Sequence, residues 1–380
     1  MDSSIINQSS LIQEITMSFW KNLFSKEPVK TEPKQSARNR QLPSQQVAPE
    51  FGEVDVLAID HQYNRILFTI LMEPTGSEAE GWQTGVALDA SASMQGEFGR
   101  LLVTGRCGPL PDVLKHHYEK QGWITKTQQD GITYSTFALP AVQDALERGH
   151  LEFTPNTVEP RAREFTAYLA DNLDADGGTT VIYWACGDGT KLDVVGDLTG
   201  TDCQTASFAG PQNTAFGSST HLAPAVRYFA ERFRDAERGM YLFITDGRLD
   251  DLAAVKQYTI GLCREIAAGR RNPLKCVLIG LGDRIDEAQM EELDDLDSGT
   301  DVDIWDHKIA HEMRDIKEIF AEVVSENQII APTARILDSN GTIVKSFSDG
   351  LPAKVTFDLP RSSNWFELEV AGRRIRQSIY

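Results

Sequence analysis

Five oxygen-bearing side chains stand where they could bind a divalent cation. Asp89 follows a short apolar run, and Ser91 and Ser93 come directly after it. Thr220 precedes an apolar helical pattern, while Asp246 follows a second short apolar run and stands before a glycine. Carboxylate and hydroxyl oxygens, without imidazole or thiolate ligands, favour hard cations such as Mg²⁺, Mn²⁺ or Ca²⁺. We therefore expect these five residues to form a divalent-cation site.

Short, continuous apolar runs predict the strands that position these side chains. The runs cover residues 86–88, 181–184, 241–245 and 276–280. Such runs are typical of strands that are buried on both faces of a parallel sheet. Helical patterns alternate with them over residues 161–173, 222–233, 251–268 and 286–296. The alternation predicts an α/β fold with a doubly wound, mostly parallel sheet flanked by helices.

The predicted sheet also suggests where the five side chains meet. In an open α/β sheet, ligands bind beyond the carboxyl ends of the strands. Asp89 ends one predicted strand and Asp246 follows another, so both carboxylates reach the same edge if these strands are neighbours. Thr179 is a rival to Thr220, but it begins a predicted strand and therefore belongs at the opposite edge. We expect Thr220 to contribute the distant hydroxyl.

Together the five residues resemble the metal-ion-dependent adhesion site of the von Willebrand factor A (vWA) family. The family pattern is Asp-x-Ser-x-Ser, a distant Thr and a distant Asp-Gly, and all positions match in order. The resemblance implies that Ser91, Ser93 and Thr220 contact the metal through hydroxyl oxygens. It also implies that Asp89 and Asp246 bind mostly through water and orient the hydroxyls. An acidic side chain of a partner protein would complete the coordination.

The resemblance spans roughly residues 85–326 and implies a divalent-metal-dependent protein-interaction module, or adaptor, of the stand-alone bacterial type. Such proteins often act with AAA-type ATPases, so a subunit that couples a partner to such a motor is an alternative. A second alternative is a metal-dependent hydrolase that uses a metal-bound water. We expect no enzyme, because no general base is evident near the five ligands, although His116 could serve as one.

The sequence departs from the family pattern directly after the metal-binding turn. Where a helix is expected, residues 95–138 carry many glycines and apolar residues, and a helix-like run over 139–146 follows. We interpret residues 95–138 as an insertion within a vWA domain of residues 81–327. Two alternatives stay open: the insertion covers the metal and selects the partner, or it packs away from the site.

The two ends of the chain have patterns of their own. Residues 1–48 predict an amphipathic helix over 11–24 and then a flexible linker. The helix has three possible docking places: a partner, its own domain or a membrane surface. Residues 49–80 contain two strand-like runs, and residues 328–380 predict a β-rich module with a hairpin turn at Asn340-Gly341. We expect these last two segments to pair into a small β-sandwich.

The charge of the chain limits its partners. With 37 Lys and Arg and 56 Asp and Glu residues, its net charge of −19 repels phosphate backbones and argues against nucleic acid. Residues 283–326 alone contain 16 acidic and 4 basic residues. This stretch indicates either a solvated helical face or a docking surface for a basic partner.

Cysteine and histidine spacing does not indicate a second metal site. The five cysteines include no CxxC pair, so we expect neither a disulfide framework nor a zinc site. His307 and His311 stand four apart on a predicted helix, but a third ligand is not evident. The cysteine usage and the absence of an apolar run long enough for a transmembrane helix predict a cytoplasmic protein. The N-terminus also lacks the pattern of a signal peptide.

Overall fold

A computed structural model describes residues 39–71, 81–129, 132–282, 284–311, 313, 316 and 329–380 of the 380-residue chain. The described residues form two compact units. Unit 1 contains residues 92–161 and 207–210, and unit 2 contains the remainder. The predicted amphipathic helix over 11–24, and the linker as far as residue 38, lie outside the described residues. No helix in the described ranges is long and apolar enough to cross a membrane.

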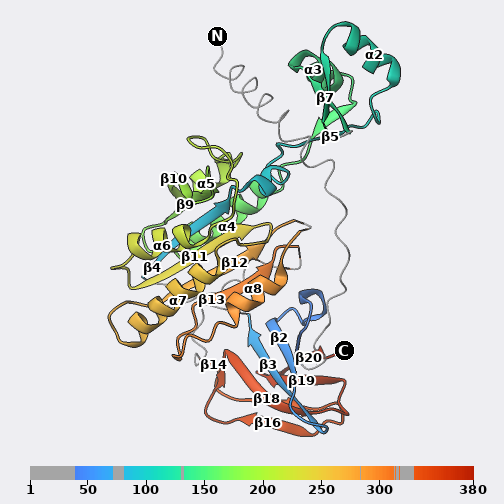
Figure 1. Ribbon diagram of the computed structural model, residues 1–380. Coiled ribbons are helices and arrows are strands. Elements are labelled where there is room, and N and C mark those ends of the chain that lie inside the picture. The colour runs from blue at the N-terminus through green and yellow to red at the C-terminus, as the bar shows by residue number, and fades with distance from the viewer. Residues whose placement is uncertain are drawn as a thin grey trace. The chain divides into compact units, whose positions relative to one another are not determined.

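The centre of unit 2 is a six-stranded mixed sheet with the order β10-β9-β4-β11-β12-β13 (Figure 1). Its strands are β4 (Trp82–Asp89), β9 (Gly178–Cys186), β10 (Lys191–Thr199), β11 (Arg238–Thr245), β12 (Leu274–Gly280) and β13 (Trp305–Ile309). Five of the strands, β9, β4, β11, β12 and β13, are parallel to one another, whereas the edge strand β10 runs antiparallel to β9. The turn between β9 and β10 is short, and a turn this short joins only antiparallel strands.

The four central strands of this sheet, β9, β4, β11 and β12, are buried on both faces. Helices of unit 2 are α4 (Val158–Asn172, from residue 162 onward), α5 (Gly200–Thr205), α6 (Ala223–Arg232), α7 (Leu252–Ala267) and α8 (Glu287–Asp294). Side chains of α6, α7 and α8 share one core with alternate strand residues, including Phe229 stacked on Tyr241 at 4.9 Å between ring centroids. The intervening strand residues, such as Val86, Leu242 and Val277, are fully buried on the opposite face. This explains the continuous apolar runs within β4, β9, β11 and β12.

The β-rich part of unit 2 contains two four-stranded sheets, ordered β1-β2-β3-β18 and β16-β15-β19-β20. Their strands are β1 (Asn39–Gln41), β2 (Phe51–Ala58), β3 (Tyr63–Ile70), β15 (Ala334–Leu337), β16 (Ile343–Phe347), β18 (Lys354–Pro360), β19 (Trp365–Val370) and β20 (Arg373–Ser378). The 3-10 helix η1 (Ser44–Gln46) and the strand pair β14 (Ile329–Ala331) and β17 (Leu351–Pro352) complete this part. Strand β18 pairs antiparallel with β3, and residues of both sheets share one hydrophobic core. Segments from opposite ends of the sequence therefore fold together.

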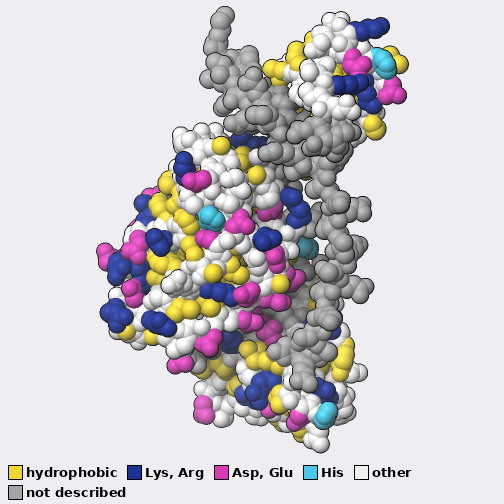
Figure 2. Space-filling view, viewed as in Figure 1, with side chains coloured by type: hydrophobic (Ala, Val, Ile, Leu, Met, Phe, Trp, Pro, Cys, Tyr) yellow, Lys and Arg dark blue, Asp and Glu magenta, His cyan; other side chains and the backbone are white. Residues whose placement is uncertain are grey.

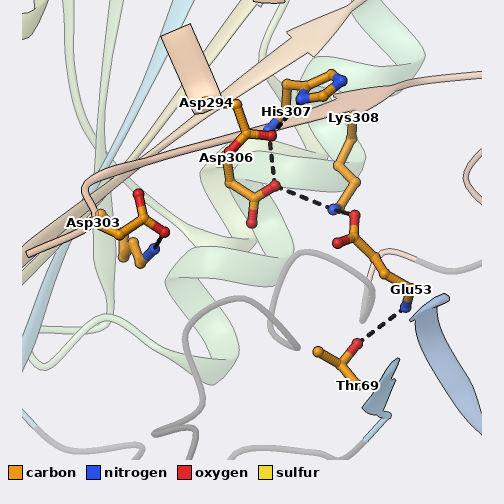
Figure 3. A network of polar contacts seen from close by, with 8 residues as sticks. Glu53, Thr69, Asp294, Asp303, Asp306, His307 and Lys308 are labelled. Carbon is orange, nitrogen blue, oxygen red and sulfur yellow. Dashed lines mark hydrogen bonds and ion pairs between the residues drawn. The ribbon is translucent and has the colours of Figure 1, made fainter. Parts of the chain in front are cut away.

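A polar network connects this β-rich part to β13 (Figure 3). The buried Lys308 of β13 forms ion pairs with Glu53 of β2 and with Asp306. On the same strand, His307 contacts Asp294 of α8, with 2.6 Å between Nδ1 and Oδ2. Burial lowers the pKa of His307, but the Asp294 carboxylate outweighs this and holds the pKa above its ordinary value.

The helix predicted around His307 and His311 is wrong, because His307 lies in strand β13. Residues of β13 pair in parallel with β12, with Trp305 opposite Cys276. Trp305 is buried, and its indole N–H donates to the Thr259 hydroxyl at 2.9 Å. Pairing with β12 and burial of this large ring favour the strand over the helix that the histidine spacing suggested.

The described part of the acidic stretch, residues 284–311, has no uniform environment. Asp306 is buried in the polar network, whereas Asp297, Asp301 and Asp303 are exposed. On the face shown in Figure 2, Lys and Arg side chains lie among the Asp and Glu side chains.

Unit 1 includes the residues that we interpret as an insertion. Its elements are η3 (Ala92–Gln95), β5 (Leu102–Thr104), α2 (Asp112–Lys120), β6 (Ile124–Gln129), β7 (Ile132–Phe137), α3 (Leu139–Glu147) and β8 (Leu151–Phe153). Strand β5 pairs with β8, and β6 pairs with β7, both antiparallel. Leu102 and Val142 form a small core with neighbouring apolar residues of β8 and α3. Because α3 packs into this core, the compact unit is longer than the 95–138 segment expected from sequence.

Candidate metal centre

Asp89 is the last residue of β4, and its fully buried carboxylate accepts hydrogen bonds from two sides. The Ser91 N–H donates to Oδ1 at 2.7 Å, and the Thr245 hydroxyl donates to Oδ2 at 2.6 Å. Thr245 ends β11, the parallel neighbour of β4. The carboxylate is therefore fixed at the carboxyl edge of the sheet, between two strand ends.

This edge is also where the order of the strands reverses. Strands β9 and β10, which follow β4 along the chain, lie on one side of it, whereas β11, β12 and β13 lie on the other. Connections that leave in opposite directions open a crevice between the two strand ends, and such crevices bind ligands in open α/β sheets. Asp89 and Thr245 end the two strands, β4 and β11, between which the order reverses.

A second carboxylate, Asp246, directly follows Thr245 and is 6% exposed. Burial raises the pKa of Asp89 to about 7, and the charge of Asp246 acts in the same direction, against the hydrogen bonds from Thr245 and Ser91. Two buried carboxylates side by side repel one another, and a bound cation offsets that repulsion. The electrostatics of the pair therefore fit a cation.

Backbone contacts hold the loop that carries Thr220 against the ends of β4 and β9. The Gly217 N–H donates to the Ala90 carbonyl at 2.8 Å, and Gly217 bridges to Ser91. A Cβ atom at Gly217 would lie only 1.8 Å from the carbonyl oxygen of Ala185. A side chain does not fit here, so glycine is what allows the loop to lie beside Ser91.

Two aspartates connect the Thr220 loop to the turn after β11. The Thr220 N–H donates to Asp250 Oδ2, and the Asp250 N–H donates to the Thr220 carbonyl, each at 2.9 Å. Asp251 accepts from the N–H groups of Leu222 and Ala223, at the start of α6. The Thr220 hydroxyl, in a residue that is 8% exposed, has no hydrogen-bond partner within the described part of the chain.

Within unit 2, the structure brings Asp89, Ser91 and Asp246 together at the ends of β4 and β11, and it places the loop that carries Thr220 beside Ser91. Ser91 is buried and its side chain hydrogen-bonds to Asp89. Ser93 lies in η3, which belongs to unit 1, and its side chain is half-buried. The contribution of Ser93 therefore remains a prediction from its spacing. The rival hydroxyl, Thr179, accepts a hydrogen bond from Thr84 near the starts of β9 and β4, at the opposite edge.

Sequence reasoning missed several residues that shape this centre. The Thr245 hydroxyl hydrogen-bonds to Asp89, and the side chains of Asp250 and Asp251 accept from backbone N–H groups of the Thr220 loop. In addition, Nη2 of Arg284 lies 3.4 Å from Asp246. Asp251 precedes α7, where an aspartate normally caps its own helix, yet its side chain caps α6 instead. Strand-end position could have indicated Thr245, but contacts between loops leave no pattern in the sequence.

The donor set is one of hydroxyls and two carboxylates. Within the described residues, no group of three or more His, Cys, Asp or Glu side chains is placed to hold a metal. All five cysteines are unpaired, and burial raises the pKa of Cys186, at the end of β9, to about 11. Oxygen donors of this kind fit a hard cation.

Comparison with known proteins yields matches among solved structures but not among family models or curated sequences. No protein-family model matches the chain, and no curated protein sequence does. Among solved structures, the chain is similar to a von Willebrand factor type A protein from Catenulispora acidiphila, with 11% identity, a TM-score of 0.34, and coverage of 90% of this chain and 75% of that chain. It is also similar to the PilB minor pilin from Streptococcus sanguinis, with 8% identity, a TM-score of 0.32, and coverage of 71% and 74%. At these identities and TM-scores the matches assign neither a family nor a function.

Proposed function

We propose that the chain binds one divalent cation through Asp89, Ser91, Ser93, Thr220 and Asp246, and uses it to bind an acidic side chain of another protein. One observation supports the proposal: the buried carboxylates of Asp89 and Asp246 interact where β4 and β11 end, and the loop that carries Thr220 lies beside Ser91 through Gly217. Mg²⁺, Mn²⁺ and Ca²⁺ all suit these oxygen donors. The sheet and its flanking helices are then those of a vWA-type domain, with β10 as an antiparallel edge strand.

Each residue has a distinct part in this proposal. Ser91, Ser93 and Thr220 supply neutral hydroxyl oxygens, so they do not cancel the charge of the cation. Asp89 orients Ser91 by accepting from its N–H at 2.7 Å, and Thr245 in turn fixes Asp89. When bound, the cation supplies a positively charged point that accepts a carboxylate from the partner protein.

Conservative substitution of the two carboxylates tests the cation site. Asp89→Asn and Asp246→Asn keep the size of each side chain but remove its charge, so we expect Mn²⁺ binding to become undetectable by isothermal titration calorimetry. Asp301→Asn is the matched control, because Asp301 is exposed. Far-UV circular dichroism and thermal melting check that each variant is folded. Wild-type Mn²⁺ affinity in folded Asp89→Asn would show that the site is assigned wrongly.

Partner binding is tested separately. Wild-type protein, Asp89→Asn and Asp301→Asn are used as bait with Mg²⁺ or with a chelator. We expect a protein that is captured by wild type and by Asp301→Asn with Mg²⁺, and that is lost with Asp89→Asn or chelator. Capture that is indifferent to Mg²⁺ and to Asp89 would contradict metal-mediated binding. The identity of the captured protein would also show whether an AAA-type ATPase is involved.

A further inference from the structure

An arginine from a neighbouring loop contacts the candidate metal centre. Nη2 of Arg284 lies 3.4 Å from Oδ2 of Asp246. The Asp246 side chain is only 9% exposed, whereas that of Arg284 is 66% exposed, so the guanidinium reaches the carboxylate from the solvent. We infer that Arg284 is a displaceable counterion, which neutralises Asp246 while no cation is bound and leaves it when a divalent cation binds. This inference rests on the proposed function.

The main chain of Arg284 is fixed close to Asp246. Gly247 follows Asp246, and a Cβ atom there would lie 2.6 Å from the carbonyl oxygen of Arg284. Just before this loop, the Leu281 N–H donates to the Thr245 carbonyl at 2.8 Å. The loop is thus packed on the turn that carries Asp246. Its position keeps the guanidinium within reach, while the long, exposed side chain retains the freedom to move away.

Because of their charges, Arg284 and a divalent cation exclude each other at Asp246. A guanidinium stays protonated at every relevant pH, so Arg284 always carries its positive charge. A divalent cation at Asp246 would be repelled by that charge at close range. An ion pair with one exposed partner is weak, and a cation that interacts with both Asp89 and Asp246 can displace it. Arg284 therefore lowers the affinity of the centre for cations without blocking it.

The test is a titration of the full chain with Mn²⁺ alone, at low ionic strength. Arg284→Gln removes the competing charge, and Arg248→Gln is the matched control. Arg248 is exposed and stands two residues after Asp246, on the same turn. We expect Arg284→Gln to bind Mn²⁺ about 3- to 10-fold more tightly than wild type, and Arg248→Gln to change affinity less than about twofold. The difference between wild type and Arg284→Gln should shrink at high salt, which screens the ion pair.

The outcomes separate this inference from the proposed function. The inference is supported if Arg284→Gln binds Mn²⁺ more tightly than wild type and Arg248→Gln does not. It is also supported if Arg284→Gln binds Mn²⁺ and wild type does not. If wild type and both variants bind equally, or if Arg284→Gln binds more weakly, Arg284 is not a competing counterion, and the proposed cation site stands. If neither wild type nor Arg284→Gln binds Mn²⁺, both the inference and the proposed function are wrong. Arg284→Lys, which keeps the charge, should stay closer to wild type than Arg284→Gln does.

Discussion

Gly217 determines where the Thr220 loop can lie. The nearest atom to a Cβ at this position would be the carbonyl oxygen of Ala185, at 1.8 Å. Ala185 itself has a φ of 55°, a left-handed conformation that residues other than glycine rarely adopt. The left-handed Ala185 at the end of β9 therefore places its carbonyl oxygen against the loop, and the absence of a side chain at Gly217 accommodates it. Unfavourable backbone conformations of this kind persist where the surrounding structure holds them.

We expect Gly217→Ala to weaken Mn²⁺ binding about tenfold or more, because the added methyl group must push the Thr220 loop away from β9. Gly261→Ala is the control: Gly261 lies in α7, and a Cβ atom there would meet nothing within 4 Å. That change should leave Mn²⁺ affinity unaltered and stabilise the fold by about 0.5–1 kcal/mol through helix propensity. Calorimetry and urea denaturation measure the two effects. Unchanged Mn²⁺ affinity in Gly217→Ala would mean that Thr220 does not contribute to the site.

Strand β13 carries a buried lysine, Lys308. Lys308 is 7% exposed, and it forms ion pairs with Asp306 on the same strand and with Glu53 on β2 (Figure 3). The backbone N–H of Glu53 donates to the Thr69 hydroxyl of β3 at 3.0 Å. This bond helps to fix β2, the strand that carries the Glu53 carboxylate. The lysine thus connects the edge of the six-stranded sheet to the β-rich part by charge rather than by apolar packing.

Removing the amine from this network should be costly. We expect Lys308→Gln to lower the free energy of unfolding by about 2–4 kcal/mol, because Glu53 and Asp306 then lose their ion pairs with the buried Lys308 ammonium group. Lys275→Gln, on the adjacent β12, breaks a more exposed pair with Asp303 and should cost less than about 1 kcal/mol. Urea denaturation of both variants measures the difference. Equal and small losses would show that the network does not stabilise the connection between β13 and β2.

Across the whole molecule, what could be predicted from sequence depended on burial. The four central strands were visible because they are buried on both faces, but the edge strands β10 and β13 were not. Val194 and Val195 of β10 are exposed, and β13 carries Asp306, His307 and Lys308. Edge strands tolerate polar residues, so they lack the continuous apolar pattern. For the same reason, the strand-end positions of Asp89 and Asp246 could be predicted, whereas Asp250, Asp251 and Arg284 depend on contacts between loops.

The structure of unit 1 allows its role to be tested by a deletion that respects its topology. Thr104 of β5 pairs with Leu151 of β8, so the two strands remain neighbours without the residues between them. Residues 105–150 can therefore be replaced by Asn-Gly, which closes a two-residue antiparallel hairpin. Leu102 and Leu151 lose the core that they share with Val142, so both are changed to Thr in this variant. The deletion retains Ser93 and the other four predicted ligands.

We expect this variant to bind Mn²⁺ within about twofold of wild type, because every predicted ligand remains, but to lose the Mg²⁺-dependent capture of its partner. The reason for the second expectation is the size of unit 1: a segment with its own strands, helices and core is more than a connection between a strand and a helix. The full-length variant with only the two Thr substitutions is the control for folding and capture. Capture that survives the deletion would assign unit 1 a structural role, and loss of Mn²⁺ binding in the folded deletion variant would place part of the cation site within residues 105–150.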